Sequence, residues 1–207
     1  MMTMILAALI AQDKPEVELP KADAEGWINL FNGKDLTGWD GDPAVWRVEE
    51  GCISGKAEKV AGNTFLVYNH KFSNFVLEAK WMLIKTGKFP NSGIQYRSKV
   101  SDWKKWIVKG YQADIGEGWS GTLYEEGGRQ VLFKAKPEVA KAVKDDWNQY
   151  VITADGPKVK QELNGIVTGE LDDADEKKRS LEGIIALQFH APGGFEIKFK
   201  DVRIKLK

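Results

Sequence analysis

Residues 91–97 read Asn-Ser-Gly-Ile-Gln-Tyr-Arg (NSGIQYR), a short alternation of apolar and polar side chains. In an extended strand Ile94 and Tyr96 fall on one face, while Gln95 and Arg97 fall on the other. The same period of two recurs after Gly26, in short runs separated by Gly, Asn, Asp and Pro. One helix is expected, over 137–146, where Pro precedes an apolar face. Many closely spaced strands with almost no helix predict an all-β fold, an antiparallel two-sheet jelly-roll sandwich.

Four of these runs carry a pair of hydrogen-bonding side chains opposite their apolar face. The pairs are Gln95 with Arg97, Gln112 with Asp114, Gln188 with His190, and Glu78 with Lys80. The alternative interpretation of all four pairs is an ordinary solvated face of an antiparallel sheet. Such faces, however, usually carry Lys, Glu and Thr. Amides combined with a cation, a carboxylate and an imidazole suit a sugar better, because each sugar hydroxyl both donates and accepts. We therefore expect the pairs to bind carbohydrate on one concave sheet face.

A glycine-rich loop, 116–129, follows the run that carries Asp114. It contains Trp119, Tyr124, Glu125, Glu126 and Arg129, and Trp103 and Trp106 come shortly before that run. Binding residues concentrate in loops beside a rigid sheet, and aromatic rings offer flat apolar surfaces. Trp119, Tyr124 and Arg129 are accordingly predicted to bind substrate, and the glutamates are candidates for acid–base chemistry.

Composition excludes several classes of protein. Of 207 residues, 43% are apolar and eight are Trp, which excludes disorder. Thirty basic residues balance thirty acidic ones, so no global charge attracts nucleic acid or an anionic membrane. The single cysteine, Cys52, forbids an intramolecular disulfide, and the two histidines are too few for a His-rich metal site. No cofactor is indicated, and a divalent cation would need mostly oxygen ligands.

The first eleven residues, Met1 to Ala11, are apolar and too few to span a bilayer. Their length and small residues suit the apolar region of a secretory signal peptide, although no Lys or Arg precedes Lys14. The alternative is a frayed start or a misplaced initiation codon. Residues 12–25 read as a charged, Pro-bearing linker. The sequence therefore predicts export, with one sandwich domain over 26–207.

Several segments together resemble the DUF1080 family, also called the 3-keto-disaccharide hydrolase domain. The matching segments are GWINLFNGKDLTGW (26–39), NSGIQYR (91–97), GYQADIG (110–116) with GTLYEEGGR (121–129), DWNQYVITADG (146–156) with LNG (163–165), and GIIALQFH (183–190) with FKDVRIK (199–205). The resemblance implies a sandwich of the concanavalin A-like lectin/glucanase type and secretion in bacteria, into the periplasm or medium. It also implies action on glycosides, often after oxidation at C3 of the sugar.

Two enzyme chemistries fit these residues. In ordinary glycoside hydrolysis two carboxyl groups flank the scissile bond, and Asp114 with Glu125 or Glu126 could supply them. In cleavage of a 3-keto-sugar a base removes the acidified C2 proton and the group on C1 leaves. His190 suits that base, and Asp114 could orient or replace it. Arg97 with Gln95 could stabilise the oxyanion.

The resulting prediction is a secreted enzyme that cleaves 3-keto-disaccharides or related glycosides. The predicted catalytic residues are His190, Asp114 and Glu125, and the predicted substrate-binding residues are Gln95, Arg97, Gln112, Gln188, Trp119, Tyr124, Glu78, Lys80 and Arg129. The rival is a lectin-like module without catalysis, and a structural cell-surface protein is a third option. The expected partner is a small carbohydrate, with no nucleic acid and no membrane span. The sugar, the linkage and the oligomeric state are left open.

Overall fold

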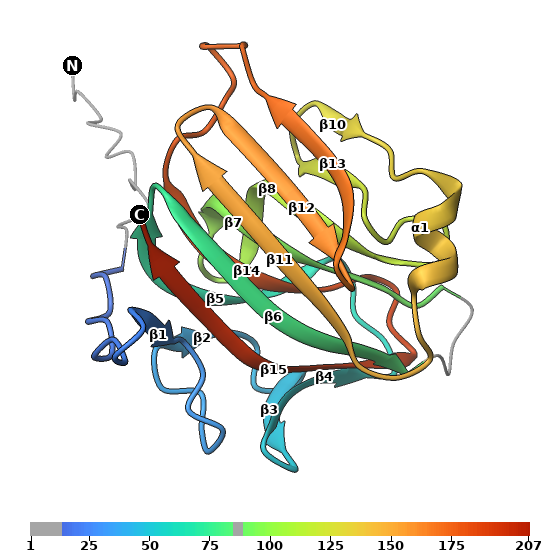
Figure 1. Ribbon diagram of the computed structural model, residues 1–207. Coiled ribbons are helices and arrows are strands. Elements are labelled where there is room, and N and C mark those ends of the chain that lie inside the picture. Colours follow the sequence, from blue (N-terminus) through green and yellow to red (C-terminus); the bar gives the residue numbers. More distant parts are fainter. Residues whose placement is uncertain (1–13, 85–88) are drawn as a thin grey trace, which may run out of the picture.

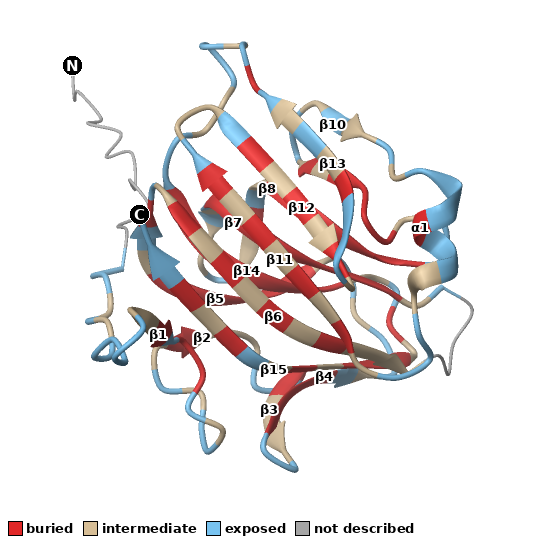
Figure 2. Cartoon of the chain, viewed as in Figure 1, coloured by how far each residue is buried: buried red, intermediate tan, exposed pale blue. Residues whose placement is uncertain are grey.

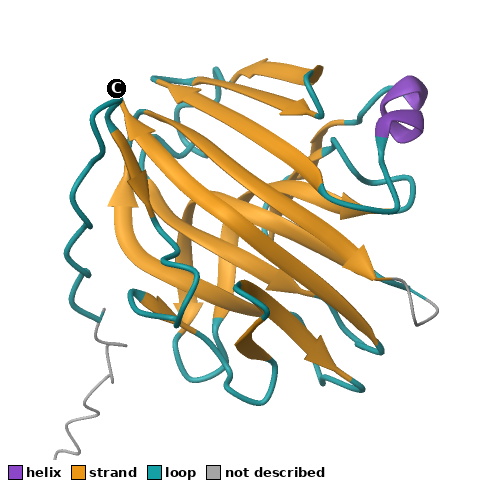
Figure 3. Cartoon of the chain, turned by 60° about the horizontal axis from the view of Figure 1, so that its bottom comes forward, coloured by secondary structure: helices purple, strands orange, loops and turns teal. Residues whose placement is uncertain are grey.

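A computed structural model of the protein describes residues 14–84 and 89–207. Two antiparallel sheets lie face to face, which confirms the predicted all-β sandwich (Figure 1). The described residues hold one helix, α1 (Pro137–Ala142), at an edge of the sandwich (Figure 3). It is shorter than the expected 137–146, because Val143 already has extended backbone angles. No helix among the described residues has the length and apolarity needed to cross a membrane.

Sheet A has eight strands and includes the last strand of the described chain. Its order is β13 (Ile166–Asp172), β12 (Lys158–Leu163), β11 (Asn148–Asp155), β6 (Phe75–Ile84), β15 (Phe195–Leu206), β4 (Cys52–Ala57) and β3 (Trp46–Glu49), with β1 (Trp27–Asn29) also paired to β15. The β12–β13 hairpin turns at Asn164-Gly165, as the sequence predicts. Both residues have positive φ, 51° and 81°, which is the backbone geometry that Asn-Gly hairpin turns adopt.

Sheet B carries three of the four polar pairs singled out in the sequence. Its order is β10 (Gln130–Phe133), β9 (Leu123–Glu126), β8 (Ile107–Gly116), β7 (Asn91–Asp102), β14 (Gly183–Phe189), β5 (Thr64–Phe72) and β2 (Trp39–Asp40). All its pairings are antiparallel. One face of sheet B packs on sheet A, and the other faces outward.

The core lies between the two sheets and follows the period of two. Burial alternates residue by residue along β6 and β11 (Figure 2). On β6 the inward side chains Leu77, Ala79 and Trp81 are buried, and Trp81 packs on Tyr150 of β11. Burying one large apolar side chain stabilises the fold by about 1.5–3 kcal/mol, so this continuous core holds the sheets together.

The β7–β8 hairpin covers half of the outer face of sheet B. Phe65, Val67 and Ala186 are fully buried there in a second apolar cluster, against which Trp103 packs. The backbone N–H of Phe65 donates to the carbonyl of Trp106 at 3.0 Å, so the connecting loop is fastened over β5. The other half of this face stays open and is polar.

Residues 14–17 are attached to the sandwich more firmly than the linker expected over 12–25. The N–H of Val17 donates to the carbonyl of Asn69 at 2.8 Å, and the Asn69 side chain donates to the carbonyls of Lys14 and Pro15. The sequence missed this because such bonds depend on no side-chain pattern in the segment itself. The predicted export segment, 1–11, lies outside the described residues, so export stays a prediction that N-terminal sequencing of the protein from its native cell would test.

Candidate active site

A hollow of about 210 Å³ lies on the open half of the outer face of sheet B. It collects side chains from β7, β8, β9 and β14 and from the loops beside them. The lining residues are Asn63, Phe89, Asn91, Gln112, Asp114, Trp119, Tyr124, Glu126, Gln188 and His190. Seven of the residues considered from the sequence are therefore brought together here: Gln112, Asp114, Trp119, Tyr124, Glu126, Gln188 and His190.

A glycine at the centre of the polar face makes room for one of the side chains that line the hollow, Gln112. Gly93 on β7 is paired with Gln188 on one side and with Asp114 on the other. A Cβ atom at this position would lie 2.5 Å from the Cδ of Gln112, far inside van der Waals contact. The Gln112 side chain thus occupies the space that a side chain at position 93 would need.

A chain of hydrogen bonds runs beneath and into the hollow. The Ser98 hydroxyl donates to Oε1 of Gln95 at 2.7 Å, and Nε2 of Gln95 donates to Oε1 of Gln112 at 2.8 Å. Nε2 of Gln112 in turn donates to Oδ1 of Asp114 at 2.5 Å and reaches Oε1 of Gln188 at 3.4 Å. Gln95 is fully buried, so it orients Gln112 from below and does not line the hollow.

Two carboxyl groups in the hollow have pKa values above their ordinary range. Burial raises the pKa of Asp114 to about 7, with a smaller contribution from the negative charge of Glu126 and opposition from the Gln112 hydrogen bond. Burial also raises the pKa of Glu126, whose carboxylate accepts hydrogen bonds from Asn63 and Gln188. Near neutral pH Asp114 can therefore exchange a proton with a ligand.

His190 directly follows β14 and lines the same hollow as these acids. Burial lowers the pKa of its imidazole, so the ring is neutral near pH 7. Its Nδ1 lies 2.5 Å from the carbonyl oxygen of Ala191, which can only accept, so Nδ1 carries the proton. Nε2 then holds the free lone pair of the ring, which is the form of histidine that acts as a base.

Aromatic side chains form two sides of the hollow. Trp119 and Tyr124 meet edge to face with ring centroids 6.4 Å apart, and the ammonium of Lys134 lies 3.7 Å from the Trp119 ring centroid. Phe89 packs against His190 at 5.8 Å between centroids. The hollow thus has flat apolar sides and a polar floor, a combination that suits a sugar ring.

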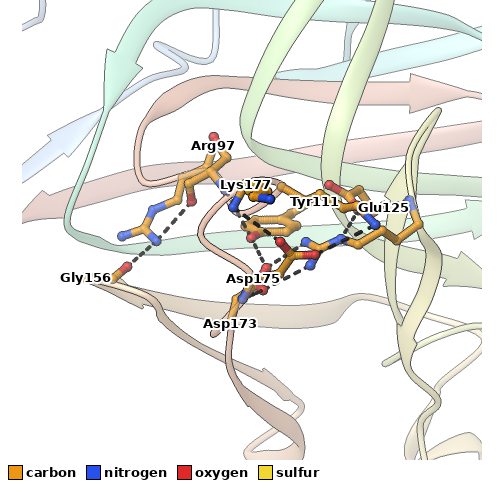
Figure 4. Close-up of polar contacts among 10 residues, drawn as sticks. Arg97, Tyr111, Glu125, Gly156, Asp173, Asp175 and Lys177 are labelled. Carbon is orange, nitrogen blue, oxygen red and sulfur yellow. Dashed lines mark hydrogen bonds and ion pairs between the residues drawn. The ribbon is translucent and has the colours of Figure 1, made fainter.

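Arg97 does not share this face, contrary to the expectation from its position in the strand. A bulge interrupts the β7–β8 pairing after Tyr96, and Arg97 itself has a φ of 47°, so the side-chain alternation breaks there. Its guanidinium donates to the carbonyl of Ser73 at 2.8 Å. It also donates to the carbonyl of Gly156 at 2.6 Å (Figure 4). Arg97 therefore joins loop ends of the sandwich and is unavailable to an oxyanion in the hollow.

Glu125 and Arg129 also lie away from the hollow. Glu125 and Glu126 are consecutive on β9, so they point to opposite faces, and Glu126 is the one that lines the hollow. Arg129 donates to Glu125 at 2.5 Å and to both oxygens of Asp173 at 3.0 and 2.6 Å. The Tyr111 hydroxyl completes this cluster on Asp173 (Figure 4). These residues fasten the β9–β10 hairpin to the loop after β13.

Glu78 and Lys80 are on β6 in sheet A, so the prediction that they share the binding face is wrong. Glu78 accepts from Arg203 at 2.7 Å, and Lys80 pairs with Asp201 at 2.8 Å. Their side chains lie on one face of the strand, as predicted, but alternation within a strand does not reveal which sheet the strand joins.

Sequence reasoning missed three residues that line the hollow: Asn63, Phe89 and Asn91. Asn91 precedes Gly93 and Gln95 at the same parity, so the alternation of NSGIQYR could have identified it. Asn63 and Phe89 lie just outside strands, where no periodic pattern applies. Among the described residues, no group of three or more His, Cys, Asp or Glu side chains is placed to hold a metal ion.

Residues 26–205 match the profile of the 3-keto-alpha-glucoside-1,2-lyase-like domain family. The chain belongs to this family. The match agrees with the resemblance read from the ordered segments. A 3-keto-disaccharide hydrolase of Bacteroides thetaiotaomicron is 39% identical over 100 residues, which cover 43% of this chain and 33% of that relative. The aligned region of this lyase-like domain thus spans a third of the relative's length.

Solved structures share the sandwich of this lyase-like domain. A proposed glycosyl hydrolase of Parabacteroides distasonis superposes with a TM-score of 0.66 at 24% identity, over 88% of this chain and 94% of that one. A carbohydrate-binding module of Bacillus subtilis gives 0.60 at 19% identity, over 81% and 95%. At these identities the likeness establishes the fold, which is of the lectin-like type predicted.

Proposed function

We propose that the protein cleaves 3-keto-glycosides by base-catalysed elimination in the hollow on sheet B. The observation that carries this proposal is the pairing, in one hollow, of a neutral histidine with two carboxyl groups of raised pKa. Perturbed titratable groups that converge in a pocket are a mark of acid–base sites. The family match and the named activity of the Bacteroides relative supply the substrate class.

In the proposed reaction the ketone at C3 acidifies the hydrogen on C2. Nε2 of His190 takes that proton, and the electron pair forms the C1–C2 double bond as the C1–oxygen bond breaks. Asp114, largely protonated below about pH 7, gives its proton to the departing oxygen. The products are an unsaturated keto-sugar and the free alcohol, and water can then add to the double bond. Amide groups of Asn91 and Gln188 replace Arg97 as donors toward the enolate oxygen.

Ordinary hydrolysis is the competing chemistry, and the geometry narrows its participants. Asp114 and Glu126 are the two carboxyls that line the hollow, so Glu126 would take the role first considered for Glu125. That route leaves His190 without a catalytic task. The two chemistries therefore differ in whether they depend on the histidine.

The test is turnover of a 3-keto-glucoside and of its unoxidised parent by the wild type and by His190→Ala. We expect the variant to lose roughly 10²–10⁴-fold in kcat on the keto substrate with little change in KM, because proton abstraction acts only in the transition state. His70→Ala is the matched control, since His70 is the other histidine of the chain. It lies on β5, outside the hollow, and its ring contacts the carbonyl of Val17.

Three outcomes would contradict the proposal. Full activity of His190→Ala would remove the histidine from the mechanism. Preference for the unoxidised parent, with dependence on Glu126, would indicate ordinary hydrolysis. Sugar binding without any turnover by the wild type would identify a lectin-like module.

A further inference from the structure

A second cavity, of about 460 Å³, adjoins the hollow on the side of His190. The two share Asn63, which lines both. Oδ1 of Asn63 accepts from the N–H of Ala191 at 3.0 Å, and its side chain also bonds Glu126. Asn63 is therefore held between the strand end that carries His190 and one of the acids.

The walls of this cavity differ in chemistry from those of the hollow. Val45, Val60, Ala61 and Ile107 give it apolar sides, and Trp106 adds an aromatic one. The indole N–H of Trp106 already donates to Asp40 at 2.9 Å, so the ring offers mainly carbon to an occupant.

Lys59, Lys104 and Lys105 also line the cavity and are exposed to solvent, whereas two other polar groups of the wall are engaged with the protein itself. The Asp42 carboxylate accepts from the N–H of Ala44 at 2.9 Å, and the Thr64 hydroxyl donates to the carbonyl of Lys105 at 3.4 Å. A second sugar would need donors and acceptors for each of its hydroxyls, as the amides of the hollow provide for the first. An apolar ring needs none. A dry cavity of about 150 Å³ is already enough to hold benzene, so size permits an aromatic ring here.

We propose that this second cavity binds the leaving group of the substrate and favours flat, largely apolar aglycones such as an aryl ring. This assignment rests on the proposed function, because it takes the hollow as the place where the sugar ring reacts. The substrate class is then an aryl 3-keto-glycoside, with the sugar in the hollow and the aryl group beyond Asn63.

The experiment compares kcat/KM for 4-nitrophenyl and methyl 3-keto-glucoside in the wild type and in Ala61→Trp. Ala61 is exposed at the cavity, so a larger ring there fills the cavity without entering the core. We expect the nitrophenyl-to-methyl ratio to fall about tenfold or more, since loss of apolar contacts in a pocket has effects of that size. The control is Ala24→Trp, the same change at an exposed alanine before β1, which leaves the ratio unchanged.

Nitrophenol has the same intrinsic reactivity as a leaving group in every variant. The change in the ratio between variants is therefore independent of that reactivity. An unchanged ratio in Ala61→Trp, with turnover of both substrates, would overturn the leaving-group cavity and leave the proposed function standing. An equal loss on a 3-keto-disaccharide would show that the cavity takes a second sugar and would overturn the aryl preference. Turnover of no keto substrate by the wild type would overturn the proposed function itself.

Discussion

Gly93 lacks a side chain, and the Gln112 side chain of the site occupies the space that this leaves. In Gly93→Ala the new methyl group would meet the Gln112 amide at 2.5 Å, so Gln112 must move and Asp114 loses its hydrogen-bond donor. We expect a loss of about 1–3 kcal/mol in the free energy of unfolding, typical of overpacking, and a raised KM. Urea unfolding measures the first and initial rates the second.

The same change made in a Gln112→Ala background provides the control for Gly93. With the amide gone, the methyl group has room, so the stability cost of Gly93→Ala should largely disappear. Equal costs in both backgrounds would show that the glycine is needed for backbone conformation and not for the space that Gln112 occupies.

Asp114 links the site to the stability of the fold. Its pKa is raised to about 7 in the folded state and is about 4 in an unfolded chain, so folding favours its protonated form. The contribution of this group to the free energy of unfolding therefore falls as pH rises from about 4 to about 7. Asp114→Asn removes that dependence, so the variant should gain on the order of 2–4 kcal/mol relative to wild type at about pH 8 and far less at about pH 4.

Chemical unfolding of both proteins across that pH range measures the difference. A constant gap between the two curves would mean that folding does not raise the pKa of Asp114, so that it cannot serve as the acid near neutral pH. Activity gives a second reading, because the wild-type rate should decline above about pH 7 as the acid loses its proton.

At the scale of elements, the β9–β10 hairpin depends on the ion cluster around Arg129. The hairpin carries Tyr124 and Glu126 into the site, and Arg129 joins it to Asp173. Hydrogen bonds from Arg129 are the main reason that the pKa of Asp173 is lowered to about 2. Arg129→Ala leaves buried carboxylates without their cation, and we expect a loss of roughly 2–4 kcal/mol in stability at neutral pH.

The pH dependence of that loss identifies its cause. A carboxyl with a lowered pKa stabilises the fold above about pH 4, and the contribution disappears as pH falls toward 2. The gap between wild type and Arg129→Ala in urea unfolding should therefore narrow in acid. Arg129→Lys, which keeps the charge without the two-pronged bond, should recover part of the stability. A gap that persists at about pH 2 would assign the loss to packing instead.

Elements also show where reasoning from the sequence stops. Alternation correctly separated Gln112 and Asp114 from the core, because the β8 strand runs regularly past them. It failed at Arg97, where the bulge changes the parity, and at Glu78, whose strand belongs to the other sheet. Neither a bulge nor the membership of a strand in a sheet leaves a mark in the period of two.

At the scale of the whole molecule the sandwich was predictable and the site only partly so. Apolar alternation over most of the chain leaves two packed sheets as the way to bury so many strand faces. The site needs a further fact, namely which loops meet which strands. Asn63 and Phe89 reach the hollow through the arrangement of β5, β7 and β14, and no local pattern predicts that meeting.

The attachment of residues 14–17 to β5 has a consequence for the protein in concentrated solution. β2 covers β5 only at Val67 and Tyr68, and the bond from Val17 to Asn69 continues that cover along the same strand. An uncovered strand edge is a template on which a second copy of a chain can add a strand and begin to aggregate. Residues 14–17 therefore cover part of the edge of sheet B, and this cover disfavours self-association through that edge.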